Sequence, residues 1–188
     1  VPGPETGRGN LRIAAYARPW RTQAVYASPE DTGFVARMAV EAPATLGHLV
    51  EALDSSAGGP FDEDAETTVK LLHGALESVS MMQLANGANS AAVRVASGAW
   101  EVLQFANAEE IAPSMWKLTG LLRGQAGTDS AALAGADEGA DFVLLNSAVP
   151  RIDLSPDEVT LALHWRIGPA GHDFGSGLFA RLVQAGAP

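Results

Sequence analysis

Trp100-Glu-Val-Leu-Gln-Phe-Ala-Asn-Ala108 is the stretch that most clearly decides the fold, because it predicts a long β-strand. Ala112-Pro-Ser114 follows it as a turn. Trp116-Lys-Leu-Thr-Gly-Leu-Leu122 then returns as a second strand. The sequence therefore predicts a long β-hairpin at the centre of the chain.

Further short strands are expected on both sides of this hairpin, separated by Gly, Pro and Asp/Ser turns. They cover residues 11–17, 23–27, 34–40, 67–72, 91–95, 142–146, 160–167 and 179–183. Residues 44–53 fit either a strand or a short helix. Many short strands between turn signals predict a mainly β fold, built as β-sandwich or barrel modules.

One or two short helices are expected within this β framework. Ser78 to Ala85 forms the better candidate, because Ser78 or Ser80 can cap its start and Gly87 suits the position just after its end. The alanine-rich segment 130–136 is expected to form a helical turn.

The expected domain organisation has three parts. Residues 1–10 are expected to be a linker, since they hold two prolines and three glycines. Residues 11–60 form an N-terminal β meander, either a separate small module or part of one domain, and residues 61–188 form the main β-rich module. The chain starts at Val1 and ends at Ala187-Pro188, so we expect a fragment of a larger multidomain protein. No signal peptide or membrane-spanning segment is expected.

Charge and composition exclude several classes of function. The formal net charge is −10, and the arginines and lysines are scattered, so direct nucleic-acid binding is not expected. The chain has no cysteine, which excludes disulfides, thiolate metal ligands and a cysteine nucleophile.

No local motif predicts catalysis. His172-Asp-Phe-Gly175 lacks the other kinase motifs, and Gly120 to Gly127 lacks the lysine of a phosphate-binding loop, so both are interpreted as glycine turns. The four histidines have no metal-ligand spacing, and the paired acidic residues are interpreted as solvated turns. We therefore expect no catalytic residues, no cofactor, no metal and no enzyme activity.

The four tryptophans are the candidate functional side chains. They are Trp20, Trp100, Trp116 and Trp165. Trp100 and Trp116 belong to the same hairpin and are expected to face each other. Two interpretations stay open for the set: core packing, or an interface or glycan-stacking platform.

Several motifs, taken in order, resemble a known family. Trp100-Glu-Val-Leu-Gln-Phe105 is followed by Leu118-Thr-Gly-Leu-Leu-Arg-Gly-Gln125, by Gly127-Thr128 and by Phe142-Val-Leu-Leu145. Together they resemble the C-terminal part of the large tail-tip protein of gene transfer agents and related phages, a host-specificity-type tail protein also called megatron. The resemblance runs from about residue 10 to residue 171. Ala126 and Asn146 depart from the family pattern.

The resemblance implies a structural component of a phage-like tail baseplate, or tail tip, at the distal end of a virion or phage-like particle. Such a component contributes to tail-channel closure, hub assembly and host-surface engagement. The implied partners are further copies of the chain in a homotrimer, the tail hub and other baseplate proteins. The alternative function is a carbohydrate- or receptor-binding module that recognises a host-surface glycan.

Overall fold

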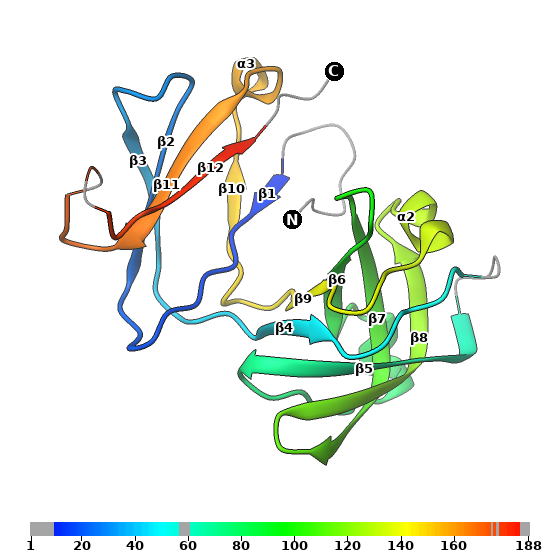
Figure 1. The fold of residues 1–188 in the computed structure, drawn as a ribbon. Coiled ribbons are helices and arrows are strands. Elements are labelled where there is room, and N and C mark those ends of the chain that lie inside the picture. Colours follow the sequence, from blue (N-terminus) through cyan, green and yellow to red (C-terminus); the bar gives the residue numbers. More distant parts are fainter. Residues whose placement is uncertain (1–9, 57–60, 174, 176, 185–188) are drawn as a thin grey trace.

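The fold is mainly β, as the sequence predicts. The computed structural model describes residues 10–56, 61–173, 175 and 177–184, and groups their strands into a closed barrel, a four-stranded sheet and a two-stranded sheet (Figure 1). Most of the expected linker, residues 1–9, lies outside the described residues, and Asn10 is the first residue of a strand.

The barrel has the strand order β4-β5-β8-β7-β6-β9, and every neighbouring pair is antiparallel. Its central hairpin is the expected one. The strands are β4 (Leu46–Leu49), β5 (Phe61–His73), β6 (Ser90–Arg94), β7 (Trp100–Ala112), β8 (Met115–Gln125) and β9 (Asp141–Leu144). Pairing of β4 with β9 closes the barrel, so no barrel strand is left as an edge.

Alternate side chains of the barrel strands fill its interior. Leu103 and Phe105 of β7 and Phe142 of β9 are fully buried there. Gln104, on the outer face of β7, is also buried at 7% exposed, and its side chain donates to the carbonyls of Leu84 and Ala88. The barrel interior is therefore a packed core.

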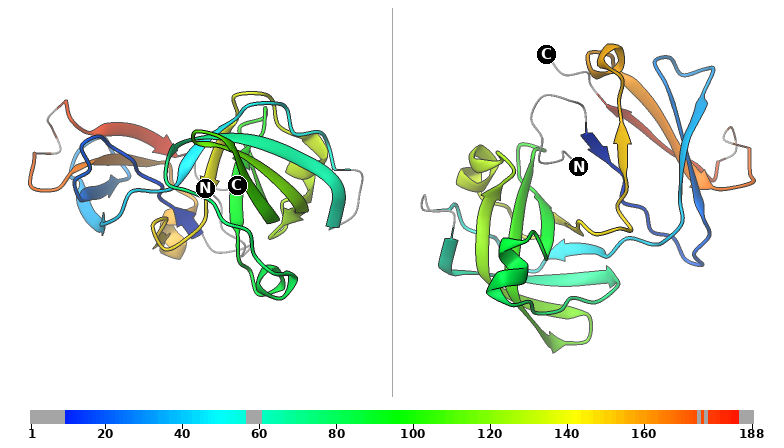
Figure 2. Two further views of the ribbon diagram at one scale, coloured as in Figure 1. Left: turned by 90° about the horizontal axis from the view of Figure 1, so that it is seen from below. Right: turned by 180° about the vertical axis from the view of Figure 1, so that it is seen from behind.

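The four-stranded sheet has the order β12-β11-β2-β3 and lies beside the barrel (Figures 1 and 2). Its strands are β2 (Gln23–Ser28), β3 (Val35–Val40), β11 (Leu163–Pro169) and β12 (Ala180–Gln184). A smaller sheet pairs β1 (Asn10–Arg12) with β10 (Arg151–Asp153). Side chains of both sheets, among them Val25, Ile152 and Trp165, form a second core.

The barrel is inserted in the chain between β3 and β10. The division expected at residue 60 falls between β4 and β5, which are paired neighbours in the barrel, while β2 pairs with β11, more than 130 residues away. A third cluster joins barrel and sheets: Ala44, Val143 and Val149 are buried in it. Leu46 and Trp100 pack against this cluster.

Three short helices are described: α1 (Met81–Ala85), α2 (Asp129–Ala134) and α3 (Pro156–Val159). Ser80 caps α1 as expected, and Gly87, at φ 89°, follows its end. The Ser80 hydroxyl accepts from the Gln83 amide and the Gln83 side chain accepts from the Ser80 amide, which satisfies two donors at the helix start. In this described part of the chain, no helix is long and apolar enough to cross a membrane.

Three expected boundaries are wrong. The strand expected at 11–17 ends at Arg12, because the chain then passes from the sheet core toward the barrel. There the Ile13 amide donates to the Pro150 carbonyl, and the Ala44 amide donates to the Ala15 carbonyl. The strand expected at 160–167 starts at Leu163, because the Ser155 cap directs residues 156–159 into α3; Leu161 is consequently 44% exposed. The loop expected at 123–128 starts only after Gln125, since β8 continues that far.

Candidate functional site: an apolar pocket beside the barrel

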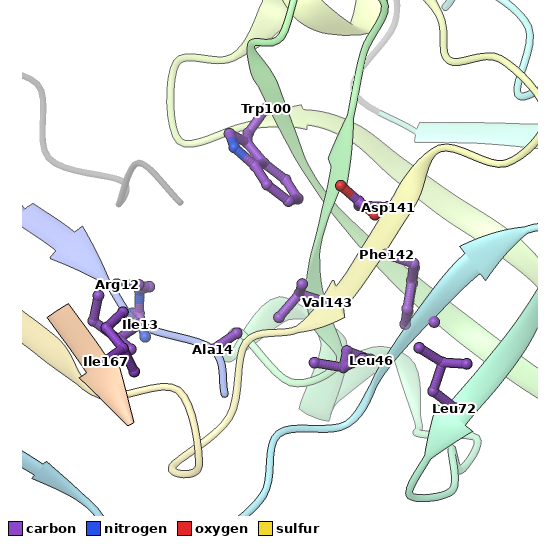
Figure 3. Close-up of a pocket in the computed structure, with 11 residues that line it drawn as sticks. Arg12, Ile13, Ala14, Leu46, Leu72, Trp100, Asp141, Phe142, Val143 and Ile167 are labelled. Atoms are coloured by element: carbon purple, nitrogen blue, oxygen red, sulfur yellow. The ribbon is translucent and has the colours of Figure 1, made fainter. Parts of the chain in front are cut away.

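An open pocket of about 320 Å³ lies where the barrel meets the small sheet (Figure 3). Figure 3 places Arg12, Ile13 and Ile167 on one side and Leu46, Phe142 and Leu72 on the other, with Trp100 pointing in from β7. Leu72 is 53% exposed, so apolar surface extends from the pocket to solvent. The full lining consists of Arg12, Ile13, Ala14, Leu46, Gly47, Leu72, Trp100, Asp141, Phe142, Val143 and Ile167.

Two charged side chains lie in this apolar wall. The Arg12 guanidinium donates from Nη1 to the Val149 carbonyl (3.1 Å), which holds it in place. Its burial lowers its pKa, and the nearby positive charge of Arg151, its cross-strand neighbour, lowers it further. Asp141 faces Arg94 across 3.6 Å, and both of these side chains are more than half exposed.

The arrangement suits binding of an apolar group. A concave wall of aliphatic and aromatic side chains removes the apolar surface of a bound group from water. A few polar groups then fix the orientation of that group. Among the described residues, no group of three or more His, Asp or Glu side chains could hold a metal ion. We therefore treat the pocket as a candidate contact site for another apolar side chain.

A buried ion pair closes one end of the barrel, and sequence reasoning missed it. The Arg123 Nε donates to Glu101 Oε1 (2.6 Å) and Nη2 donates to Oε2 (2.9 Å), while both side chains are at most 1% exposed. Arg123 Nη1 also donates to the Asp54 carbonyl (3.1 Å) and so ties the loop after β4 to β8. The available signal was Glu101 itself, which strand alternation places on the same face as Leu103 and Phe105.

The barrel coincides with a known family domain. The family described as "Rcc01698-like, C-terminal" matches residues 44–143, which is more than half of the chain and runs from just before β4 into β9. The chain belongs to this family. The family takes its name from a gene of the Rhodobacter capsulatus gene transfer agent. A comparison with curated proteins finds no match.

The tryptophans of this Rcc01698-like chain lie in separate places. Trp100 lines the pocket. Trp116 packs against the barrel core. Trp20 packs against the sheet core and donates from Nε1 to the Glu41 carbonyl (3.2 Å), and Trp165 is buried in that core at 2% exposure.

The expectation that Trp100 and Trp116 face each other is wrong. Trp116 pairs with Glu110 near the closed end of the β7–β8 hairpin, whereas Trp100 lies beyond Val102 at its open end. The strands are long, so two residues at opposite ends of one hairpin cannot touch.

The two glycine motifs that were interpreted as turns are only partly turns. Residues 126–128 form a turn in which Gly127 has φ of 76°, whereas Gly124, with φ of 61°, still belongs to β8; glycine adopts both values without strain. His172 and Asp173 are exposed in the loop between β11 and β12, where Asp173 accepts from the Gly175 amide (2.8 Å). Phe174 of that motif lies outside the described residues.

Proposed function

We propose that this chain is a structural component of a phage-like tail baseplate or tail tip, and that it acts through assembly rather than catalysis. The observation that carries the proposal is the family match: a family named after a gene transfer agent gene spans the barrel from β4 to β9. The order of the motifs in the sequence, from Trp100 to Leu145, supports the same assignment.

The architecture supports a role as a rigid building block. The barrel interior is filled by side chains such as Leu103 and Phe105, and a third cluster around Val143 and Val149 couples the barrel to the sheets. A well-packed body of this kind holds its surfaces in fixed relative positions. We propose that these surfaces contact the tail hub, other baseplate proteins and further copies of the chain in a homotrimer, and that the assembly helps to close the tail channel.

One sheet edge offers a surface for such contacts. In the four-stranded sheet β3 has a single strand neighbour, β2, and Val35 of β3 is 61% exposed. An edge strand with unpaired backbone groups readily pairs with a strand of another chain.

Immunogold electron microscopy of purified tailed particles tests the proposal. Antibody raised against the folded chain should place gold at the distal tail tip, alongside an antibody to a known baseplate protein as a positive control. Denatured particles probed with the same antibody separate a hidden epitope from a missing protein. Absence of the chain from the denatured particles would overturn the proposal.

Binding of a host-surface glycan is the alternative function. It is favoured by the partial exposure of Trp20, Trp100 and Trp116, because a sugar ring stacks on an accessible indole face. Trp165 offers no such face at 2% exposure. A glycan array should then show binding that Trp20→Ala or Trp116→Ala abolishes, while Trp100→Ala tests the pocket. Binding unchanged by all three substitutions would contradict this alternative.

A further inference from the structure

Two adjacent methionines of α1 are exposed to solvent. Met81 is 58% exposed and Met82 is 77% exposed, the highest value among the large apolar side chains of the described residues. The left view of Figure 2 shows the green segment that holds α1 projecting away from the barrel strands. Apolar side chains at the tip of a projection cannot be buried by their own core.

The projection is firmly anchored, so the exposure of the methionines is built into the fold. The Gln104 side chain donates from Nε2 to the carbonyls of Leu84 (2.8 Å) and Ala88 (2.7 Å), which bracket the end of α1. Asn89 Nδ2 donates to the Glu77 carbonyl (2.8 Å), and Leu84 is 1% exposed. A rigid apolar projection loses little conformational entropy on binding.

The pocket beside the barrel matches this projection in size and chemistry. Its volume is about 320 Å³. A cavity of roughly 150 Å³ accommodates benzene, so the pocket has room for two methionine side chains of four heavy atoms each. Methionine adapts to irregular apolar walls, and its sulfur makes favourable contacts with aromatic rings such as that of Trp100.

The charges on the two surfaces are also complementary. Residues 76–89 carry a single charged side chain, Glu77. The pocket wall carries Arg12, and its one acid, Asp141, already faces Arg94. Because the chain has a net charge of −10, two copies can associate only through surfaces that do not place acidic side chains opposite one another.

We propose that Met81 and Met82 of one copy insert into the pocket of a second copy of this chain. The chain cannot fill its own pocket with them, because Gln104 and Asn89 hold α1 on the outer face of β7. The contact is heterologous, because projection and pocket are different surfaces. After one contact the first copy still has a free pocket and the second a free projection, so such contacts build rings or filaments. The inference rests on the proposed assembly function and specifies a contact between two copies of the chain in that assembly.

Disulfide trapping tests the contact directly, because the chain has no cysteine of its own. Met82→Cys and Leu72→Cys chains are mixed under mild oxidation, and a mixed dimer should form at least ten-fold faster than the dimer of Met82→Cys with Leu161→Cys. Leu161 is the matched control, since it is also a leucine, is 44% exposed, and lies just before β11, whose pocket residue Ile167 is near the other end of the strand. Equal rates for the two mixtures, or preferential trapping of Met82→Cys with itself, would overturn the proposal.

A second pair of variants separates insertion from chance proximity. Adding Met81→Lys to the Met82→Cys chain should slow trapping with Leu72→Cys at least ten-fold, because an ammonium group would enter an apolar pocket that already holds Arg12. Asn86→Lys adds the same charge at an exposed position of the same segment and should leave the rate nearly unchanged. Equal slowing by both would overturn insertion. Gold at the tail tip together with failed trapping would reject this contact and leave the proposed function standing.

Discussion

Arg123 and Glu101 form a two-point ion pair inside the barrel, with Nε–Oε1 and Nη2–Oε2 distances of 2.6 and 2.9 Å. The Gly124 amide also donates to Glu101 Oε1 (3.2 Å). Through Arg123, the pair holds the carbonyls of Asp54 and Ala132 as well, so the loop after β4 and helix α2 are both fixed to one buried charge.

Removing one partner of this pair should destabilise the fold strongly. Glu101→Gln leaves the Arg123 charge buried without a counter-charge, which typically costs about 3–5 kcal/mol. Urea unfolding followed by tryptophan fluorescence measures the loss. Glu66→Gln is the matched control, because Glu66 pairs with Lys117 at 2.8 Å with both side chains more than a third exposed, and such pairs contribute about 1 kcal/mol or less. Equal losses of unfolding free energy for Glu101→Gln and Glu66→Gln would show that Glu101 does not balance a buried charge.

Gly47→Ala should disrupt the pairing of β4 with β5. A Cβ at residue 47 would clash with the Lys70 carbonyl oxygen and lie 2.9 Å from the Leu71 Cα, both backbone atoms. Overpacking costs about 1–3 kcal/mol where side chains can adjust, and here the strands themselves must separate. Thermal unfolding should show a large loss for Gly47→Ala and none for Gly177→Ala, where a Cβ meets nothing within 4 Å. An unchanged melting temperature for Gly47→Ala would show that β4 does not approach β5 this closely at residue 47.

Gln104→Leu should loosen α1 without opening the barrel. The substitution removes the side-chain donor of the Ala88 carbonyl and one of the two donors of the Leu84 carbonyl, which keeps the Gly87 amide; an unsatisfied buried group costs about 1–3 kcal/mol. Hydrogen exchange should speed up at residues 79–89 and stay slow in β4 and β9. Asn107→Ala, on the same strand, removes only an exposed bond to Thr119 and serves as the control. Uniformly faster exchange would point to global destabilisation instead.

Lowering the pH should remove the contribution of the contact between Glu158 and Arg37. The hydrogen bond from Arg37, and then the Ser155 amide, lower the pKa of Glu158 below its ordinary value of 4.5. A carboxyl with a lowered pKa in the folded state stabilises the fold fully above pH 4.5, and loses that contribution as the pH falls through the folded-state pKa. Arg37→Gln should therefore destabilise the protein at pH 7, by about 1 kcal/mol or less, and have no effect at pH 2. The same effect at both values would contradict a charge contribution.

Local patterns in the sequence were enough for the central hairpin and for the Ser80 cap, because strand periodicity, turn residues and capping are properties of neighbouring residues. The pairing of β2 with β11 was not predictable in this way, since the periodicity of a strand does not name its partner. The helix at 156–159 did leave a local signal that was overlooked: Ser155 and Glu158 have the spacing of a capping box, and the Ser155 amide and hydroxyl both donate to Glu158 Oε2.

Local sequence patterns could not predict the pocket, for a related reason. Arg12, Leu46 and Ile167 are ordinary residues of three separate strands, and only the insertion of the barrel brings them together. Trp100 was selected from the sequence as a functional candidate, and it does line this pocket, although its expected neighbour Trp116 does not. The buried position of Arg123 was hidden because its glycine neighbours suggested a loop.

The way in which the barrel is joined to the sheets has a mechanical consequence. The chain enters the barrel at β4 and leaves it at β9, and these two strands are antiparallel neighbours, with the Leu144 amide bonded to the Thr45 carbonyl (3.0 Å). Tension along the chain therefore passes through the β1–β10 and β2–β11 pairs and bypasses the barrel while those pairs hold. Once they part, the same tension pulls on adjacent ends of β4 and β9, and the barrel opens along that seam one hydrogen bond at a time.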